Sequence, residues 1–171
     1  MATRRQFIKA GVVTSLLLAG ATPVLAPLWR PPEWPAPGLR WLRAGDAAIV
    51  AALAPVMLGV PDVPRADVTR GVDVAIASLP PVVQAEVRQL FVLLGHPLGR
   101  RWLAGVRPDW EHATAAELSG FLQRWRVNRF LLMRSAYQAL HALIGAAWYG
   151  SPASWGAIGY RQPERIMEYM R

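Results

Sequence analysis

From residue 39 onward, apolar residues recur every three to four positions in five segments, and no segment alternates apolar and polar residues. The first pattern places apolar side chains on one face of a helix, whereas a half-buried strand needs the second. The sequence therefore predicts an all-α fold, a single compact helical bundle of about five to six helices. Residues 39–171 suffice for one domain with a real core.

Capping residues and helix breakers divide this stretch into elements. Asp46 is expected to cap the first helix, and Thr114 forms a capping box with Glu117 three residues later. The last long helix is apolar on most sides, which is typical of a central helix. The predicted helices cover residues 46–58, 67–79, 80–94, 114–125 and 128–148, with a short element over 98–106.

The chain begins with a charged segment that runs directly into the uncharged apolar stretch 10–21. Two consecutive arginines, an aromatic residue and a closing lysine are typical of a twin-arginine export signal, which a receptor of the translocase recognises. We interpret residues 1–26 as this signal segment and expect folded export to the periplasm. The residues of the export signal are Arg4, Arg5, Phe7 and Lys9.

Two fates of this leader are open from the sequence. The small residues Ala19, Gly20 and Ala21 favour cleavage near Ala21. Residues 10–28, however, form an apolar span of 19 residues, close to the roughly 20 that cross a bilayer. A retained leader would make the chain a membrane-anchored scaffold subunit, which is one alternative interpretation.

Residues 27–43 form a Pro/Trp-rich segment between leader and helices. Five prolines lie between residues 27 and 38, with Trp29 and Trp34 among them, so the backbone is expected to be extended. The tryptophans favour an arm that docks, on its own domain or on another subunit, over a free linker. Residues 44–171 are then the helical domain with its C-terminal segment.

Charge and composition exclude several functions. Without the leader's two arginines and Lys9, 16 arginines face 11 acidic residues, a net charge of +5. An exported chain of moderate charge meets little nucleic acid, so we expect no nucleic-acid partner. The chain has no cysteine, which excludes iron–sulfur ligation, covalent haem attachment and disulfides.

No pattern in the chain predicts chemistry. His96, His112 and His141 lack a second ligand at metal spacing, and the glycines near 95–99 and 156–159 lack the third glycine of a dinucleotide site. We therefore expect no catalytic, cofactor-binding or metal-binding residue here. The rival interpretation is a free-standing periplasmic enzyme or ligand-binding protein. Its pocket would lie among Trp102, Trp110, Trp125 and His141.

The C-terminal stretch 148–163 is dense in aromatic residues, with two tryptophans, two tyrosines, three glycines and two prolines. Rigid aromatic side chains suit a protein–protein anchor, although a cap over the bundle's own core would need the same residues. With the tryptophans of the arm, the predicted partner interface comprises Trp29, Trp34, Trp148, Tyr149, Pro152, Trp155, Ile158, Gly159, Tyr160 and Pro163.

The leader, the helical pattern and this ending together resemble the gluconate 2-dehydrogenase subunit 3 family, small subunits of membrane-bound, flavin-dependent sugar and polyol dehydrogenases. Where family members often have Gly-Tyr-Pro-Gly-Pro, this chain has Gly-Tyr-Arg-Gln-Pro at 159–163. The resemblance implies a non-catalytic subunit that stabilises a large FAD-dependent dehydrogenase of the glucose–methanol–choline type. That partner, which binds the FAD, lacks an export signal and crosses the membrane with its small subunit. A cytochrome c subunit often accepts the electrons.

Overall fold

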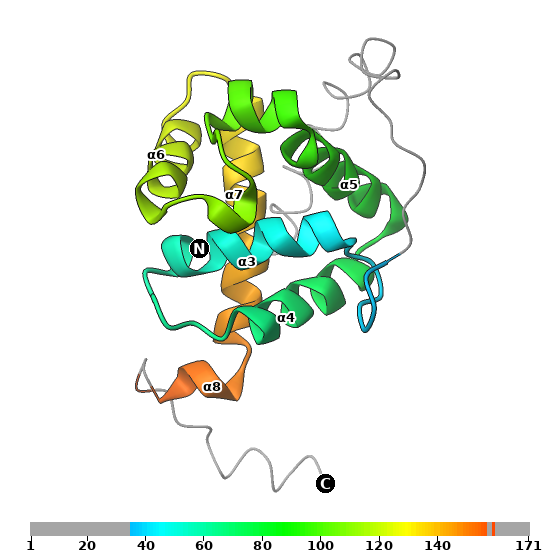
Figure 1. The fold of residues 1–171 in the computed structure, drawn as a ribbon. Coiled ribbons are helices and arrows are strands. Elements are labelled where there is room, and N and C mark those ends of the chain that lie inside the picture. Colours follow the sequence, from blue (N-terminus) through cyan, green and yellow to red (C-terminus); the bar gives the residue numbers. More distant parts are fainter. Residues whose placement is uncertain (1–34, 157–158, 160–171) are drawn as a thin grey trace, which may run out of the picture.

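The computed structural model describes residues 35–156 and Gly159, and every regular element among them is a helix (Figure 1). The all-α prediction is therefore confirmed. The elements are α3 (Ala44–Leu58), α4 (Arg65–Ala77), α5 (Pro81–Gly95), the π-helical η3 (Gly99–Ala104), the 3-10 turn η4 (Trp110–His112), α6 (Ala115–Arg126), α7 (Leu131–Tyr149) and α8 (Pro152–Trp155).

The long helix α7 runs behind α3 and α4, which cross it in Figure 1, and α6 also packs against it. Its buried residues Leu140, Ile144 and Trp148 join the common core. The crossing with α4 is close, since a Cβ added at Gly71 would lie 2.9 Å from the Cβ of Ala147. A glycine is needed at this position because any larger residue would push the two helices apart.

The predicted start of α6 is confirmed in atomic detail. The Glu117 amide donates to the Thr114 hydroxyl (3.3 Å), and the Thr114 amide donates to the Glu117 carboxylate (3.0 Å). The expectation that Asp46 caps the first helix is wrong. That helix starts two residues earlier, and Asp46 is its third residue, accepting a hydrogen bond from the amide of the capping residue Arg43 (3.0 Å).

The capping box of α6 makes a prediction about acid stability. Hydrogen bonds from the backbone amide and then the hydroxyl of Thr114 lower the pKa of Glu117 below its ordinary 4.5. The carboxylate therefore stabilises the fold above pH 4.5, and this contribution disappears as the pH falls through the lowered pKa. We expect Glu117→Gln to flatten the acid limb of a thermal-unfolding series against pH. Parallel curves for wild type and variant would contradict this.

Other helix boundaries differ modestly from the sequence expectations. The second helix spans Arg65–Ala77 rather than 67–79, and the last long helix begins at Leu131 rather than 128. Among the described residues, no helix is long and apolar enough to cross a bilayer. The export-signal residues and the alternative membrane span of the leader lie outside this part of the chain, as do Trp29 and Trp34.

Candidate partner-binding surfaces

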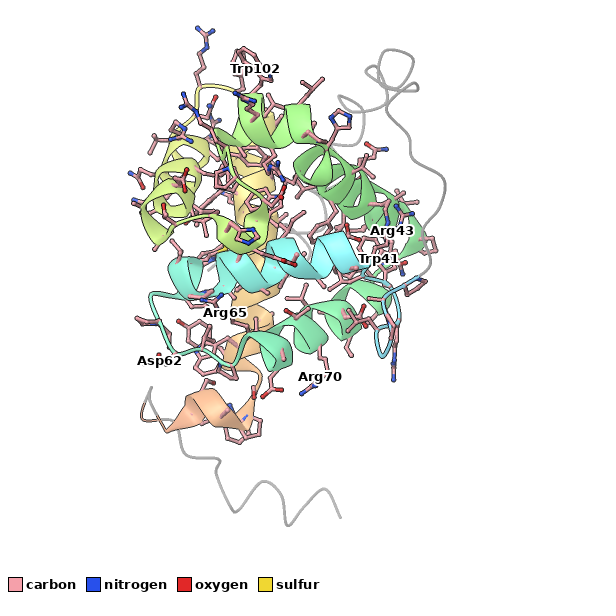
Figure 2. All side chains as sticks on the ribbon, viewed as in Figure 1. Trp41, Arg43, Asp62, Arg65, Arg70 and Trp102 are labelled. Carbon is pink, nitrogen blue, oxygen red and sulfur yellow. The ribbon has the colours of Figure 1, made fainter. Side chains whose placement is uncertain are left out.

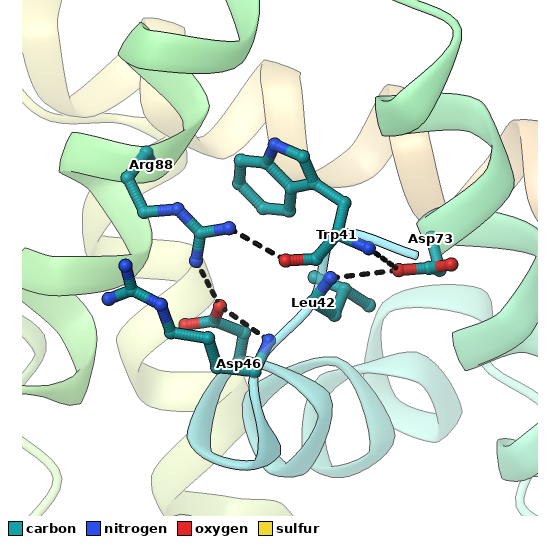
Figure 3. A network of polar contacts seen from close by, with 6 residues as sticks. Trp41, Leu42, Asp46, Asp73 and Arg88 are labelled. Carbon is teal, nitrogen blue, oxygen red and sulfur yellow. Dashed lines mark hydrogen bonds and ion pairs between the residues drawn. The ribbon is translucent and has the colours of Figure 1, made fainter. Parts of the chain in front are cut away.

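The end of the arm is fixed to the domain by a buried carboxylate of α4. Asp73, only 2% exposed, accepts hydrogen bonds from three consecutive backbone amides, those of Arg40 (2.8 Å), Trp41 (2.9 Å) and Leu42 (2.8 Å). Figure 3 shows the bonds from Trp41 and Leu42. These amides precede α3 and have no partners of their own in a helix. One side chain thus holds the chain segment that leads into the domain.

Arg88 of α5 holds the same segment from the other side. Its guanidinium donates to the Trp41 carbonyl (2.7 Å), pairs with Asp46, and lies 3.5 Å from the centroid of the Trp41 ring (Figure 3). Desolvation by burial lowers the pKa of Arg88, and the nearby Asp46 opposes this. Residues 40–42 are therefore attached to α3, α4 and α5 at once. The described part of the arm docks on its own domain.

The C-terminal segment turns back over the end of α7. The indole Nε1 of Trp155 donates to the Tyr149 carbonyl (3.2 Å), and the Ser154 hydroxyl, fully buried, donates to the Ser151 carbonyl (2.8 Å). Trp148 is buried in the core. This part of the segment is therefore a cap on the bundle.

Part of the same C-terminal segment is exposed to solvent. Tyr149 is 50% exposed and Pro152 is exposed beside it, while Gly159 has a left-handed backbone with φ of +67°. Ile158, Tyr160 and Pro163 lie outside the described residues. Within the partner interface predicted from the sequence, Trp148 is thus buried, whereas Tyr149 and Pro152 are exposed. The role of this interface in binding stays a prediction.

A groove of about 840 Å³ runs along the outer face of α3. Small side chains of α3 form its floor, and its other lining residues come from the 37–39 turn, the first turns of α4, η4 and the start of α6. The floor residues are Ala44, Ala47, Ala48, Ala51 and Pro55, and the wall residues include Arg65, Ala66, Thr69, Trp110 and Leu118. We call this feature the α3 groove.

Helix α3 is apolar around its whole circumference. Its inner face buries Ile49, Val50 and Leu53, its outer face is the alanine floor of the groove, and Asp46 is its only charged residue. A helix that is apolar on all sides normally belongs in the interior of an assembly. Sequence analysis missed this surface, although alanines three to four positions apart, opposite a large apolar face, were visible in the sequence.

The pocket expected by the rival interpretation does not form. Trp110 and Trp125 are buried and both pack edge-to-face against Phe121, with centroid distances of 5.9 Å and 4.8 Å. Their indole nitrogens donate to backbone carbonyls of residues 94 and 103 (3.1 and 3.0 Å). Trp102 is 79% exposed, and His141 is an exposed residue of α7 beside Tyr137. Trp110 and Trp125 thus belong to the core, whereas Trp102 and His141 lie at the surface.

Three titratable groups of the described domain hold its own backbone. The buried carboxylates of Asp46 and Asp73 bind backbone amides, and the His96 ring accepts from the Leu98 amide (3.2 Å). Within residues 35–156, no three His, Asp or Glu side chains are grouped as a metal site would require.

Comparison with known proteins assigns no family to the chain. It matches no protein-family model, and searches of curated proteins and of solved structures find no match.

Proposed function

We propose that the protein is a non-catalytic accessory subunit that binds a large FAD-dependent dehydrogenase of the glucose–methanol–choline type and escorts it through twin-arginine export to the periplasm. The dehydrogenase binds the FAD and removes hydride from its alcohol or sugar substrate, and a cytochrome c subunit is a further candidate member of the complex. This chain supplies the export signal and a stabilising surface.

The observation that carries the proposal is the α3 groove. Its lining extends along α3 from Ala44 to Val56, about 18 Å at the rise of an α-helix. Alanine floors allow the backbone of an incoming segment to approach closely, as small residues do between packed helices. Covering this floor would bury the exposed face of an apolar helix, which stabilises both partners.

The groove suits a protein segment better than a small molecule. Small-molecule sites usually combine apolar walls with a few convergent polar groups. Here the Thr69 hydroxyl already donates to the Arg65 carbonyl within α4 (2.8 Å), and the Arg70 guanidinium pairs with Asp67. The other two charged residues of the lining, Arg65 and Glu111, are exposed. The floor presents only methyl groups and a proline ring, which can match the shape of a partner but offer it no hydrogen-bonding or charged side chain.

The leader supports the same role. The twin-arginine route carries folded proteins, so it suits cargo that acquires its cofactor in the cytoplasm. The described domain uses its buried polar groups to hold its own backbone, as Asp73 and Arg88 do. A companion that binds a cofactor would therefore account for the route.

The test is export of the companion in the native host. Replacing Arg4 and Arg5 by lysine is expected to leave the dehydrogenase in the cytoplasm, measured as flavin-dependent dehydrogenase activity in the periplasmic and cytoplasmic fractions. The matched control replaces the exposed Arg40 and Arg107 by lysine, which preserves the leader and the groove lining. Normal periplasmic activity in the leader variant would refute the escort role.

A further inference from the structure

One end of the bundle carries a cluster of exposed apolar side chains from two separate segments. Helix η3 and the last turn of α6, which leads into the α6–α7 connection, lie side by side, since the Trp125 indole donates to the Leu103 carbonyl (3.0 Å) and the Arg124 guanidinium donates to the Ala104 carbonyl (2.7 Å). Figure 2 shows Trp102 at this end of the molecule. The exposed apolar residues, which we call the apical patch, are Leu98, Trp102, Leu103, Val127, Phe130 and Leu131.

The exposure within the apical patch is large for residues of this kind. Trp102 is 79% exposed, Val127 66% and Phe130 56%. Single exposed apolar residues are ordinary, but a group from two neighbouring segments marks a surface that contacts something else. The patch includes the tip of η3 and the start of α7, so it forms an end of the bundle rather than a groove.

The stretch of chain that contains the patch holds the whole net charge of residues 35–156. Segment 97–134 has seven arginines and three carboxylates, whereas the remainder of 35–156 has five of each. Within the parts that form the patch, 98–104 and 124–134, there are six arginines and no carboxylate. Among these six, Arg100 pairs with Asp109.

Three of these arginines lie at the surface beside the apolar residues. Arg101 adjoins Trp102, Arg126 adjoins Val127, and all of them are exposed. The Arg129 guanidinium, also exposed, lies 4.7 Å from the centroid of the Phe130 ring. Each cation therefore has a large apolar neighbour, and the charge of the patch is of one sign.

We propose that the apical patch docks the protein on an anionic phospholipid surface. Trp, Phe and Leu side chains insert at the boundary between headgroups and acyl chains, and the arginines beside them pair with lipid phosphates. Each basic residue near an anionic bilayer contributes about 1 kcal/mol of attraction. The segments that form the patch, 98–104 and 124–134, have six arginines and no carboxylate, which matches the uniformly negative surface of an anionic bilayer.

This docking is compatible with a companion in the α3 groove. Helix α6 lines the groove with Ala115 and Leu118 near its first turn, and its last turn leads into the patch. The two ends of this 12-residue helix are about 18 Å apart. The membrane-facing surface is thus separate from the groove, and the inference does not depend on the proposed function.

The test measures binding of the full-length protein to vesicles of phosphatidylglycerol with phosphatidylcholine and to vesicles of phosphatidylcholine alone. We expect preference for the anionic vesicles, and the double variant Arg126→Glu/Arg129→Glu to bind them at least about tenfold more weakly. The matched control Arg40→Glu/Arg65→Glu has the same net charge, with its changes outside the patch, and should retain most of the binding. The leader is identical in all of these proteins.

Two further variants separate charge from apolar insertion. Arg126→Lys/Arg129→Lys should bind as wild type, because the positive charge is kept, and Trp102→Ala should bind more weakly with unchanged circular dichroism. Equal binding by the glutamate variant and its control would overturn the proposal. So would loss of a protein companion in the glutamate variant without any loss of vesicle binding, since the patch would then be a protein interface.

Discussion

Replacing Asp73 by alanine is expected to lower the free energy of unfolding by about 3 to 5 kcal/mol. The carboxylate is 2% exposed and accepts hydrogen bonds from the amides of Arg40, Trp41 and Leu42. Removing it leaves three amides without their acceptor, one of them in a buried hydrogen bond. The segment that Arg88 holds through Trp41 would lose its second attachment, and Leu42, which is fully buried, would be free to leave the core.

Thermal and denaturant unfolding check this expectation. A loss of this size corresponds to a decrease of roughly 10 °C or more in Tm for a domain of this length. Asp73→Asn should have an intermediate effect, because the amide oxygen still accepts while the amide nitrogen does not. The control is Asp67→Ala on the same helix, whose side chain is 54% exposed and pairs with Arg70. Equal Tm values for the two alanine variants would show that the buried carboxylate does not stabilise the arm junction.

Filling the α3 groove is expected to release the companion while the fold stays intact. The double variant Ala48→Arg/Ala51→Arg places two long cationic side chains on the alanine floor. A docked partner would then have to bury them without counter-charges, so we expect about a hundredfold weaker binding or more. Stability should change by less than about 0.5 kcal/mol, since both side chains can extend into solvent when the groove is empty.

Affinity purification from the native host measures this effect as loss of the flavin absorption that accompanies the tagged protein. The control Val82→Arg/Ala85→Arg adds the same charge to exposed positions of α5, away from the groove. Flavin recovery equal to that of the control would exclude the groove as the docking site. If the dehydrogenase is still exported normally with the groove variant, only the assignment of the groove fails. The escort role is tested separately by the leader variants.

The parts of the fold that could be predicted are those fixed by neighbours in the sequence. Thr114 and Glu117 are three residues apart, and their reciprocal hydrogen bonds need no other part of the chain. Asp46 was assigned to the right helix end but to the wrong position. Its carboxylate accepts from the amide of Arg43 and also pairs with Arg88, a residue 42 positions away.

The parts that could not be predicted depend on distant contacts. Asp73 lies on a helical face that would ordinarily be solvated, and its function depends on amides 31 to 33 residues earlier. The alanines on the outer face of α3 are neither polar, as on a solvated surface, nor large, as in a core. The spacing of apolar residues therefore did not show whether this face is exposed or buried. The rival interpretation placed Trp102 and Trp125 in one pocket because both are tryptophans. In the structure, Trp102 is exposed on η3 and Trp125 is buried.

The attachment of residues 40–42 by Asp73 and Arg88 also has a mechanical consequence. If the leader is drawn through a translocase, tension along the arm reaches the domain at this junction. Three hydrogen bonds to Asp73 and one from Arg88 distribute that force over two helices before it can peel α3 from the bundle. Pulling on the N-terminus should therefore meet its first resistance at this junction, before the force reaches the packing of α3 against the other helices.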